Sequence, residues 1–284
     1  MQRRALLSPS RIVYALGTRL LAGPEGEERF PRARRIWQPL FDRLYSSFPF
    51  RRRVAMRDFQ IYVSTLDTLV SQRLLAGQEW ERRTSELFRR ELRPGMVVLD
   101  IGAHIGYFTL LAARLVGERG RVFAFEPLER CCRLLTRSLR SNGFGNVTVV
   151  PKGASNQTGR IRLGQSWRMI DVVPLDEFFA DPGFRVDFIK MDIDGGELAA
   201  LEGMKNLVRN NPAAKVVLEY DPACLKMCGV QPAELFAKLD EMDFQAQSLC
   251  DDREDREIAL PSGMRAEDAT RGLAGHANLL LVRP

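Results

Sequence analysis

Short apolar runs that alternate with helical segments constrain the fold more than any other feature of this 284-residue sequence. Five runs are apolar almost throughout, and helical periodicity fills intervening stretches such as residues 109–116 and Glu129–Asn142. The five runs are Val97–Ile101, residues 121–126, 147–152 and 186–193, and Lys215–Tyr220. Strands that are apolar on both faces and alternate with helices predict a parallel sheet covered on both sides.

The chain continues this α/β plan at both ends. We expect a helix over residues 232–242, a strand over 244–249, a charged loop over 251–257 and a last strand over 278–282. Residues 54–63 alternate like a small hairpin, and residues 67–92 have a helical pattern that is broken near Gly77. We therefore predict a helical extension over residues 1–53 and one α/β domain over 54–284.

The basic charge of the chain is confined to the extension. Residues 1–53 contain 12 arginines and four acidic residues, whereas the remainder contains 30 basic and 32 acidic residues. Apolar positions repeat near the helical period over residues 12–20 and 36–48, and arginines flank the second stretch. Two interpretations stay open. The stripes pack on the domain or on a second copy of the chain, or they lie on an anionic membrane surface.

Cysteines and hydropathy exclude several classes of protein. The five cysteines form no CxxC pair and have no histidine nearby, so they predict neither a disulfide framework nor a zinc site. The sequence has no apolar stretch of about 18 residues that could span a membrane, and Pro9, Arg11 and Arg19 interrupt any signal-peptide core. We expect a cytoplasmic protein, and if the stripes lie on a membrane, the extension contacts its inner face.

Residues 97–106, VVLDIGAHIG, end a strand, form a turn supported by glycine and open a helix. Ligands bind at this place in open α/β sheets. We expect Gly102 to let the backbone approach a ligand closely, and the helix from Gly106 to offer N–H groups to a carboxylate. Glu126 ends the next strand, where a carboxylate can accept hydrogen bonds from both hydroxyls of a ribose.

The spacing of this loop separates two kinds of nucleotide ligand. Dinucleotide loops follow G-x-G-x-x-G and bind a negatively charged pyrophosphate, whereas this loop has G-x-x-x-G and carries Asp100 at its entrance. A carboxylate there disfavours pyrophosphate, but S-adenosylmethionine has no phosphate and carries a sulfonium and an ammonium. The loop therefore favours an S-adenosylmethionine-dependent methyltransferase over a nicotinamide-dependent dehydrogenase.

Several segments, taken in order, resemble the FkbM-type methyltransferase family over residues 56–284. They are residues 100–109, 123–127, 187–197, 218–220 and 278–282. The resemblance implies a Rossmann-like class I methyltransferase fold, doubly wound, with a mostly parallel sheet and an antiparallel last strand. It also implies S-adenosylmethionine as the cofactor and methyl transfer to a hydroxyl of a sugar, glycan or polyketide-like metabolite. Two departures are His104, where the family usually has Asn, and Asp194-Gly195, where it usually has Glu-Gly.

Methyl transfer to oxygen requires an in-line approach and removal of the hydroxyl proton. Lys190 and Asp192 lie on one face of a strand near its carboxyl end, so either they pair with each other or Asp192 binds substrate or takes the proton. Glu219 ends a neighbouring strand and is expected near Asp192, and Glu197 is expected to cap a helix. Magnesium bound by these carboxylates is an alternative, but their spacing matches no metal signature and we predict no metal.

His276 and Asn278 are placed by the usual methyltransferase topology, in which the last strand lies between the fifth and sixth. That position brings His276 near the pocket, where it is either a base or only a surface residue. We assign catalysis to Asp192, Lys190 and His276. We assign cofactor binding to Asp100, Gly102, His104, Gly106, Glu126, Pro127, Ala154 and Asp192.

Two other functions compete with methylation of a small-molecule or glycan hydroxyl. The arginine-rich extension suggests a nucleic-acid methyltransferase, but the balanced charge of the domain argues against that partner. A non-catalytic membrane-associated binding module is the other alternative, and the intact Asp100, Gly102 and Glu126 argue against it. A homo-oligomer formed through the apolar stripes is a further expectation.

Overall fold

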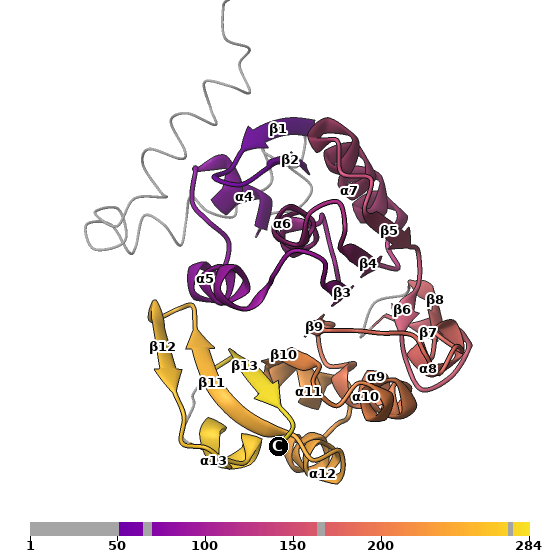
Figure 1. Cartoon of the computed structure of the whole chain (residues 1–284), viewed down its shortest axis with the longest axis vertical. Coiled ribbons are helices and arrows are strands. Elements are labelled where there is room, and N and C mark those ends of the chain that lie inside the picture. The colour runs from indigo at the N-terminus through magenta and orange to yellow at the C-terminus, as the bar shows by residue number, and fades with distance from the viewer. Residues whose placement is uncertain (1–50, 65–69, 164–167, 272–274) are drawn as a thin grey trace, which may run out of the picture. The chain divides into compact units, whose positions relative to one another are not determined.

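The computed structural model describes residues 51–64, 70–163, 168–271 and 275–284 (Figure 1). The chain divides into two compact units, of which the first comprises residues up to 56 and 62–80 and the second comprises 57–61 and 81–284. Both apolar stripes of the extension lie outside the described residues. The extension and its boundary after residue 53 therefore stay predictions, although a strand, β1, crosses that boundary.

The first unit contains β1 (Arg51–Ala55), most of β2 (Gln60–Ser64) and α4 (Val70–Leu75). The two strands pair in a two-stranded sheet, which confirms the predicted hairpin. The backbone N–H of Ser64 donates to Ser71 Oγ at 3.2 Å and so ties β2 to α4. The helix predicted over residues 67–92 is broken where expected, because Gly77 follows α4 with φ of 77°.

An eight-stranded sheet forms the centre of the second unit, in the order β12-β11-β13-β10-β9-β3-β4-β5 (Figure 1). The five strands from β10 to β5 are parallel, and β13 lies antiparallel between β10 and β11, as the resemblance implied. The strands are β3 (Val97–Ile101), β4 (Arg121–Phe125), β5 (Val147–Val150), β9 (Phe188–Met191), β10 (Lys215–Tyr220), β11 (Gln245–Asp251), β12 (Arg256–Ala259) and β13 (Ala277–Val282). This is the doubly wound plan of a Rossmann-like methyltransferase.

Helices cover both faces of this sheet, with α5, α6 and α7 on one side and α9, α10, α12 and α13 on the other (Figure 1). The helices are α5 (Arg82–Glu91), α6 (Tyr107–Val116), α7 (Glu129–Asn142), α8 (Leu175–Phe178), α9 (Glu197–Glu202), α10 (Lys205–Asn210), α11 (Pro222–Met227), α12 (Pro232–Glu241) and α13 (Ala266–Thr270). All residues of β9 are buried, which explains why the runs are apolar throughout. None of the described helices has the length and hydropathy needed to span a bilayer.

Aromatic packing joins α5 to the sheet. The ring of Phe88 lies 4.8 Å from that of Phe108 in α6 and 5.1 Å from that of Phe188 in β9. Such ring pairs add about 0.5–1.5 kcal/mol each beyond the burial of apolar area. Because Phe88 is fully buried, these contacts hold α5 against α6 and the first residue of β9.

Two predicted details differ from the structure. The stretch 251–257 is not a simple loop, because β11 continues to Asp251 and β12 begins at Arg256 and pairs with it. A three-stranded sheet between β5 and β9 was not predicted. It has the order β6-β8-β7 and comprises β6 (Gly153–Ala154), β7 (Gly159–Arg162) and β8 (Met169–Val173). Strands of two to five residues carry too little alternation to be detected from sequence.

Candidate active site

The turn after β3 is packed against the chain that leaves β9. Gly102 has φ of 88°, and a Cβ atom at this position would lie 1.8 Å from the carbonyl oxygen of Asp192. We expected Gly102 to let a ligand approach the backbone. In the structure the close neighbour is the main chain of Asp192, so glycine is required for the packing of two loops on each other.

The next residues of the turn also have left-handed backbone conformations. His104 has φ of 50° and Gly106, which precedes α6, has φ of 95°. Asn and His enter this region more readily than most residues, which explains why His104 can replace the Asn usual in the family. Asp194, the other departure, has φ of 53° and is followed by Gly195 at 100°, so a short polar residue suits that turn too.

Asp100, at the end of β3, is a buried carboxyl with one oxygen left over. Its Oδ2 accepts a hydrogen bond from Thr109 Oγ1, whereas its Oδ1 has no hydrogen-bond partner among the described residues. Burial raises the pKa of Asp100 above its ordinary value, although Lys190 opposes this. A buried polar oxygen without a partner is rare in native proteins, and here it fits a ligand that donates from a cationic group.

Glu126, just after β4, is oriented by two backbone groups. Its Oε2 accepts from the N–H of His104 at 2.8 Å and its Oε1 from the N–H of Leu128 at 2.7 Å. Pro127 has no N–H to donate, so the second bond comes from Leu128. Burial raises the pKa of Glu126 to about 7. Each carboxylate oxygen has a further acceptor position, which fits the expected pair of ribose hydroxyls.

The residues at the cofactor loop therefore fit S-adenosylmethionine. Asp100 presents an unsatisfied oxygen for a cationic group, and Glu126 presents a fixed carboxylate for the ribose. Ala154 is placed differently from these two, since it is buried in β6 within the apolar core.

Lys190, which is buried, and Asp192, which is partly exposed, form an ion pair near the carboxyl end of β9. Lys190 is only 2% exposed, its Nζ lies 2.8 Å from Asp192 Oδ2, and it also lies 4.9 Å from the centre of the Phe108 ring. Mutual pairing is thus the arrangement in the structure. Burial opposes the charge of Asp192, but Lys190 and a hydrogen bond with Glu219 together hold the pKa of Asp192 below its ordinary value.

Glu219 is the penultimate residue of the adjacent strand β10 and shares a hydrogen bond with Asp192, as the strand order predicted. Burial and the negative charge of Asp192 raise the pKa of Glu219 far above its ordinary value. Glu219 therefore holds a proton at neutral pH and donates it to Asp192. The two side chains form a carboxyl–carboxylate pair rather than two charges.

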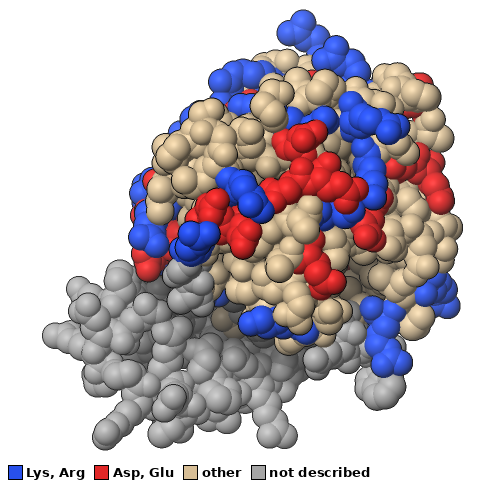
Figure 2. Space-filling view, turned by 90° about the horizontal axis from the view of Figure 1, so that it is seen from below, with Lys and Arg blue, Asp and Glu red and all other residues tan. Residues whose placement is uncertain are grey.

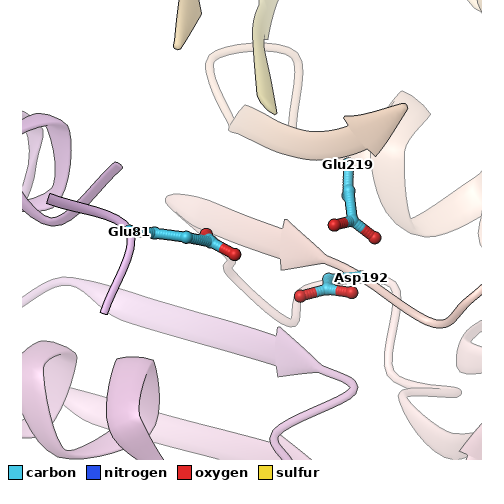
Figure 3. A group of neighbouring side chains, drawn as sticks. All are labelled: Glu81, Asp192 and Glu219. Atoms are coloured by element: carbon cyan, nitrogen blue, oxygen red, sulfur yellow. The ribbon is translucent and has the colours of Figure 1, made fainter. Parts of the chain in front are cut away.

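Glu81 is the member of this group that the sequence did not reveal. It immediately precedes α5 with φ of 41°, and its side chain points toward Asp192 and Glu219 (Figure 3). Oxygen atoms of these three residues all lie within 4.8 Å of one another. An acidic residue before a helix is commonly a solvent-exposed cap, so only the fold shows that Glu81 is 6% exposed and faces the site.

Asn278 and His276 come from the last strand. Asn278 lies opposite Glu219 in the β10–β13 register and donates through Nδ2 to Glu81 Oε2 at 3.2 Å. His276 precedes β13 and is partly exposed, and burial followed by the nearby Arg253 lowers its pKa. A neutral imidazole can accept a proton, so its candidacy as a base stays a prediction.

Glu197 caps the turn after β9. Its Oε1 accepts from the N–H of Ile193 at 3.1 Å and from the N–H of Gly195 at 3.2 Å. Burial raises its pKa to about 7. The sequence predicts a helix cap, but α9 begins after Gly196 with no side-chain cap bond, and Glu197 instead orders the loop on which Asp192 and Asp194 lie.

The carboxyl groups of Glu81, Asp192 and Glu219 converge closely enough to form a candidate site for a divalent cation. The ammonium of Lys190 already supplies positive charge to Asp192, and Glu219 is protonated. This arrangement suits proton transfer or hydrogen bonding to a hydroxyl as it stands.

Comparison with known proteins assigns the chain to a family. A model of the methyltransferase FkbM domain matches residues 100–246, more than half of the chain. Protein-L-isoaspartate O-methyltransferase of Methanococcoides burtonii is 37% identical over 60 residues, which are 21% of this chain and 30% of that protein. The corresponding protein of Methanothermobacter thermautotrophicus is 35% identical over 60 residues, 21% of this chain and 28% of its own. The chain thus matches less than a third of the length of these relatives.

Two solved structures are similar at lower identity. Methyltransferase FkbM from Methylobacillus flagellatus KT has 19% identity and a TM-score of 0.41, covering 85% of this chain and 58% of that one. Fibrillarin of Aeropyrum pernix, solved with S-adenosyl-L-methionine, has 13% identity and a TM-score of 0.44, covering 71% of this chain and 74% of that one. On the match of the family model, the chain belongs to the FkbM methyltransferase family, and its domain is that of an S-adenosylmethionine-dependent methyltransferase.

Proposed function

We propose that this protein transfers a methyl group from S-adenosylmethionine to a hydroxyl of a sugar, glycan or polyketide-like metabolite. The observation that carries the proposal is the group formed by Lys190, Asp192, Glu219 and Glu81 at the carboxyl ends of β9 and β10. These side chains can orient a hydroxyl and receive its proton. Bound S-adenosylmethionine supplies an electrophilic methyl group on a sulfonium.

The cofactor side of the site supports this proposal. Asp100 lies beside Lys190 in the β3–β9 register, so the loop that receives the cofactor is one strand away from the side chains of Lys190 and Asp192. The acceptor oxygen must lie in line with the sulfonium methyl, at the edge where these two strands end. The relatives in Methanococcoides and Methanothermobacter are named as O-methyltransferases, which agrees with oxygen as the atom methylated.

The charge of the described domain does not favour a nucleic acid as the acceptor. Figure 2 shows acidic side chains gathered in a band across one face, with basic side chains beside them rather than in a continuous basic surface. Many of the exposed basic side chains form ion pairs with acidic ones, as in Arg90–Glu257 and Arg265–Asp240. A backbone-binding surface needs unpaired Lys and Arg in a stripe.

The cellular location of the protein and the contacts of its extension are also proposals. A cytoplasmic location and a contact of the extension with anionic lipid or with a second copy rest on the arginines and apolar stripes of residues 1–53. The non-catalytic alternative is disfavoured by the oriented carboxylate of Glu126 and the orphaned oxygen of Asp100, which a domain without a ligand would not need.

The proposal is tested with methyl-labelled S-adenosylmethionine and a metabolite extract, followed by mass spectrometry and NMR of the labelled product. We expect the label on an oxygen of a hydroxylated metabolite. Glu126→Gln should abolish most of the labelling, whereas Glu129→Gln, an exposed position three residues along, should leave it unchanged. Label found on nitrogen, carbon or nucleic acid would contradict the assignment of the acceptor.

A further inference from the structure

We propose that Glu81, rather than Asp192, is the general base that removes the proton from the acceptor hydroxyl. The inference rests on the proposed function and assigns a catalytic residue within the same site. Glu81 lies outside residues 100–246, the part of the chain that the family model matches.

Asp192 is poorly suited to take a proton, because its oxygens are already engaged. Lys190 Nζ donates to its Oδ2 at 2.8 Å, and the protonated Glu219 shares a hydrogen bond with the same carboxylate. These partners hold the pKa of Asp192 below its ordinary value, which makes it a weak base. Glu219 already carries a proton and cannot accept another.

Glu81 has a carboxylate oxygen that is open to accept a proton, which Asp192 and Glu219 lack. Its Oε2 accepts from Asn278 at 3.2 Å, and its Oε1 accepts no hydrogen bond from the described residues. The side chain is 6% exposed, and one of its oxygens lies within 4.8 Å of an oxygen of Asp192 and of one of Glu219 (Figure 3). Burial raises the pKa of Glu81 to about 8, close to the working pH at which a general base is most effective.

The cofactor loop borders the same buried ammonium. Lys190 interacts electrostatically with Asp192, with Asp100 and with Glu81. The Oδ1 of Asp100, buried and without a described partner, is an independent sign that a polar ligand belongs beside Lys190. Lys190 therefore lies between Asp100, whose Oδ1 we assign to the cofactor, and Glu81, whose carboxylate we assign to the acceptor.

The fold holds Glu81 in place through a distant hairpin. Asp252, in the β11–β12 connection, accepts from the N–H of Arg83 at 2.6 Å and from Thr84 Oγ1 at 2.6 Å. It thereby caps α5, while the carbonyl of Glu81 accepts from the N–H of Ser85 at 2.8 Å. The backbone at Glu81 is thus tied to the first turn of α5, and Asp252 is a positioning residue.

The proton of the acceptor hydroxyl moves to Glu81 as the methyl group is transferred. The O–H bond of the acceptor breaks and its proton passes to Oε1 of Glu81, while the acceptor oxygen forms a bond to the methyl carbon. The electron pair of the broken sulfur–methyl bond stays on sulfur, which becomes a neutral thioether. Glu81 then returns the proton to water, so one proton is released for each methyl group transferred.

The test compares Glu81→Gln with Glu86→Gln, a partly exposed glutamate in the helix that Glu81 precedes. Methyl-labelled S-adenosylmethionine and the metabolite extract are the probes. Glu81→Gln should lower the labelling rate by at least about a hundredfold and leave cofactor affinity within about twofold, since general-base catalysis contributes roughly 10²–10⁴. Glu81→Asp should retain part of the rate. A wild-type rate should rise with pH up to about 8 because the base must be ionised.

Three results would overturn the role of Glu81. The first is a Glu81→Gln variant that labels product at the wild-type rate. The second is a pH profile of the labelling rate that this substitution leaves unchanged. The third is a labelling rate that a chelator abolishes and magnesium restores. Carbon-13 NMR of labelled glutamate carboxyls needs no acceptor. It should show a group that titrates near pH 8 and disappears in Glu81→Gln. If the wild type labels no product, the proposed function fails, whereas a missing titration near pH 8 refutes the role of Glu81 alone.

Discussion

Replacement of Lys190 by Met tests how the site keeps several carboxyl groups together. Lys190 is 2% exposed and pairs with Asp192 at 2.8 Å, and its charge also acts on Asp100 and Glu81. Removing one partner of a buried ion pair costs about 3–5 kcal/mol, because the remaining charge stays buried without compensation. Because the side chain of Asp192 is 25% exposed, water partly compensates its charge, and we expect Lys190→Met to lower the unfolding free energy by about 3 kcal/mol, the lower end of this range, at pH 8.

The loss should depend on pH with a definite sign. Lys190 holds the pKa of Asp192 below its ordinary value, so the pair stabilises the protein above that value and loses its effect as the pH falls. In Lys190→Met the carboxyl groups can bind protons instead. The difference in unfolding free energy between wild type and variant should therefore shrink as the pH falls from 8 toward 4.

Urea denaturation followed by circular dichroism measures this difference. Asp192→Asn and the double variant complete a cycle, in which the two losses should be clearly less than additive because the residues contact each other. Equal stability of Lys190→Met and wild type at pH 8, within about 0.5 kcal/mol, would refute the account of the pair. So would a loss that grows as the pH falls.

Three further predictions concern the cofactor loop and the extension. Gly102→Ala should lower the unfolding free energy by more than about 3 kcal/mol, because its Cβ would lie 1.8 Å from the carbonyl oxygen of Asp192. Gly143→Ala, also at positive φ but with nothing within 4 Å of the added Cβ, should lower it by about 1–2 kcal/mol. Equal losses of unfolding free energy in urea denaturation would contradict the packing argument. Glu126→Ala should weaken S-adenosylmethionine binding at least about tenfold in calorimetry, since two charge-assisted hydrogen bonds of about 1.5–3 kcal/mol each are removed, and unchanged affinity would mean that the ribose is held elsewhere. Deletion of residues 1–50 should spare cofactor binding but lower the melting temperature or break an oligomer; sedimentation with anionic vesicles that requires the extension and weakens with salt would instead assign it to lipid.

Much of the sheet could be predicted because its signal is local. Val97–Ile101 and Lys215–Tyr220 have the predicted bounds, since a strand buried on both faces is apolar along its whole length. The pairing of Lys190 with Asp192 follows from strand alternation, and the proximity of Glu219 follows from the order of parallel strands.

The parts of the site that could not be predicted depend on contacts between residues far apart in the chain. Glu81 is held in the site by residues late in the sequence, because Asn278 donates to its carboxylate and Asp252 caps the following helix. The need for glycine at position 102 comes from the main chain of Asp192, which no local pattern reveals. Sequence periodicity describes single elements, so it cannot show which side chain a distant loop brings to the pocket.

Isothermal calorimetry of the full chain with S-adenosylmethionine, its demethylated product and NAD tests the central claim most directly. Asp100 and the G-x-x-x-G loop disfavour a pyrophosphate, whereas Glu126 is oriented for a ribose. The account predicts micromolar-range binding of S-adenosylmethionine and of its demethylated product, and no comparable binding of NAD. Binding of NAD without binding of S-adenosylmethionine would contradict it.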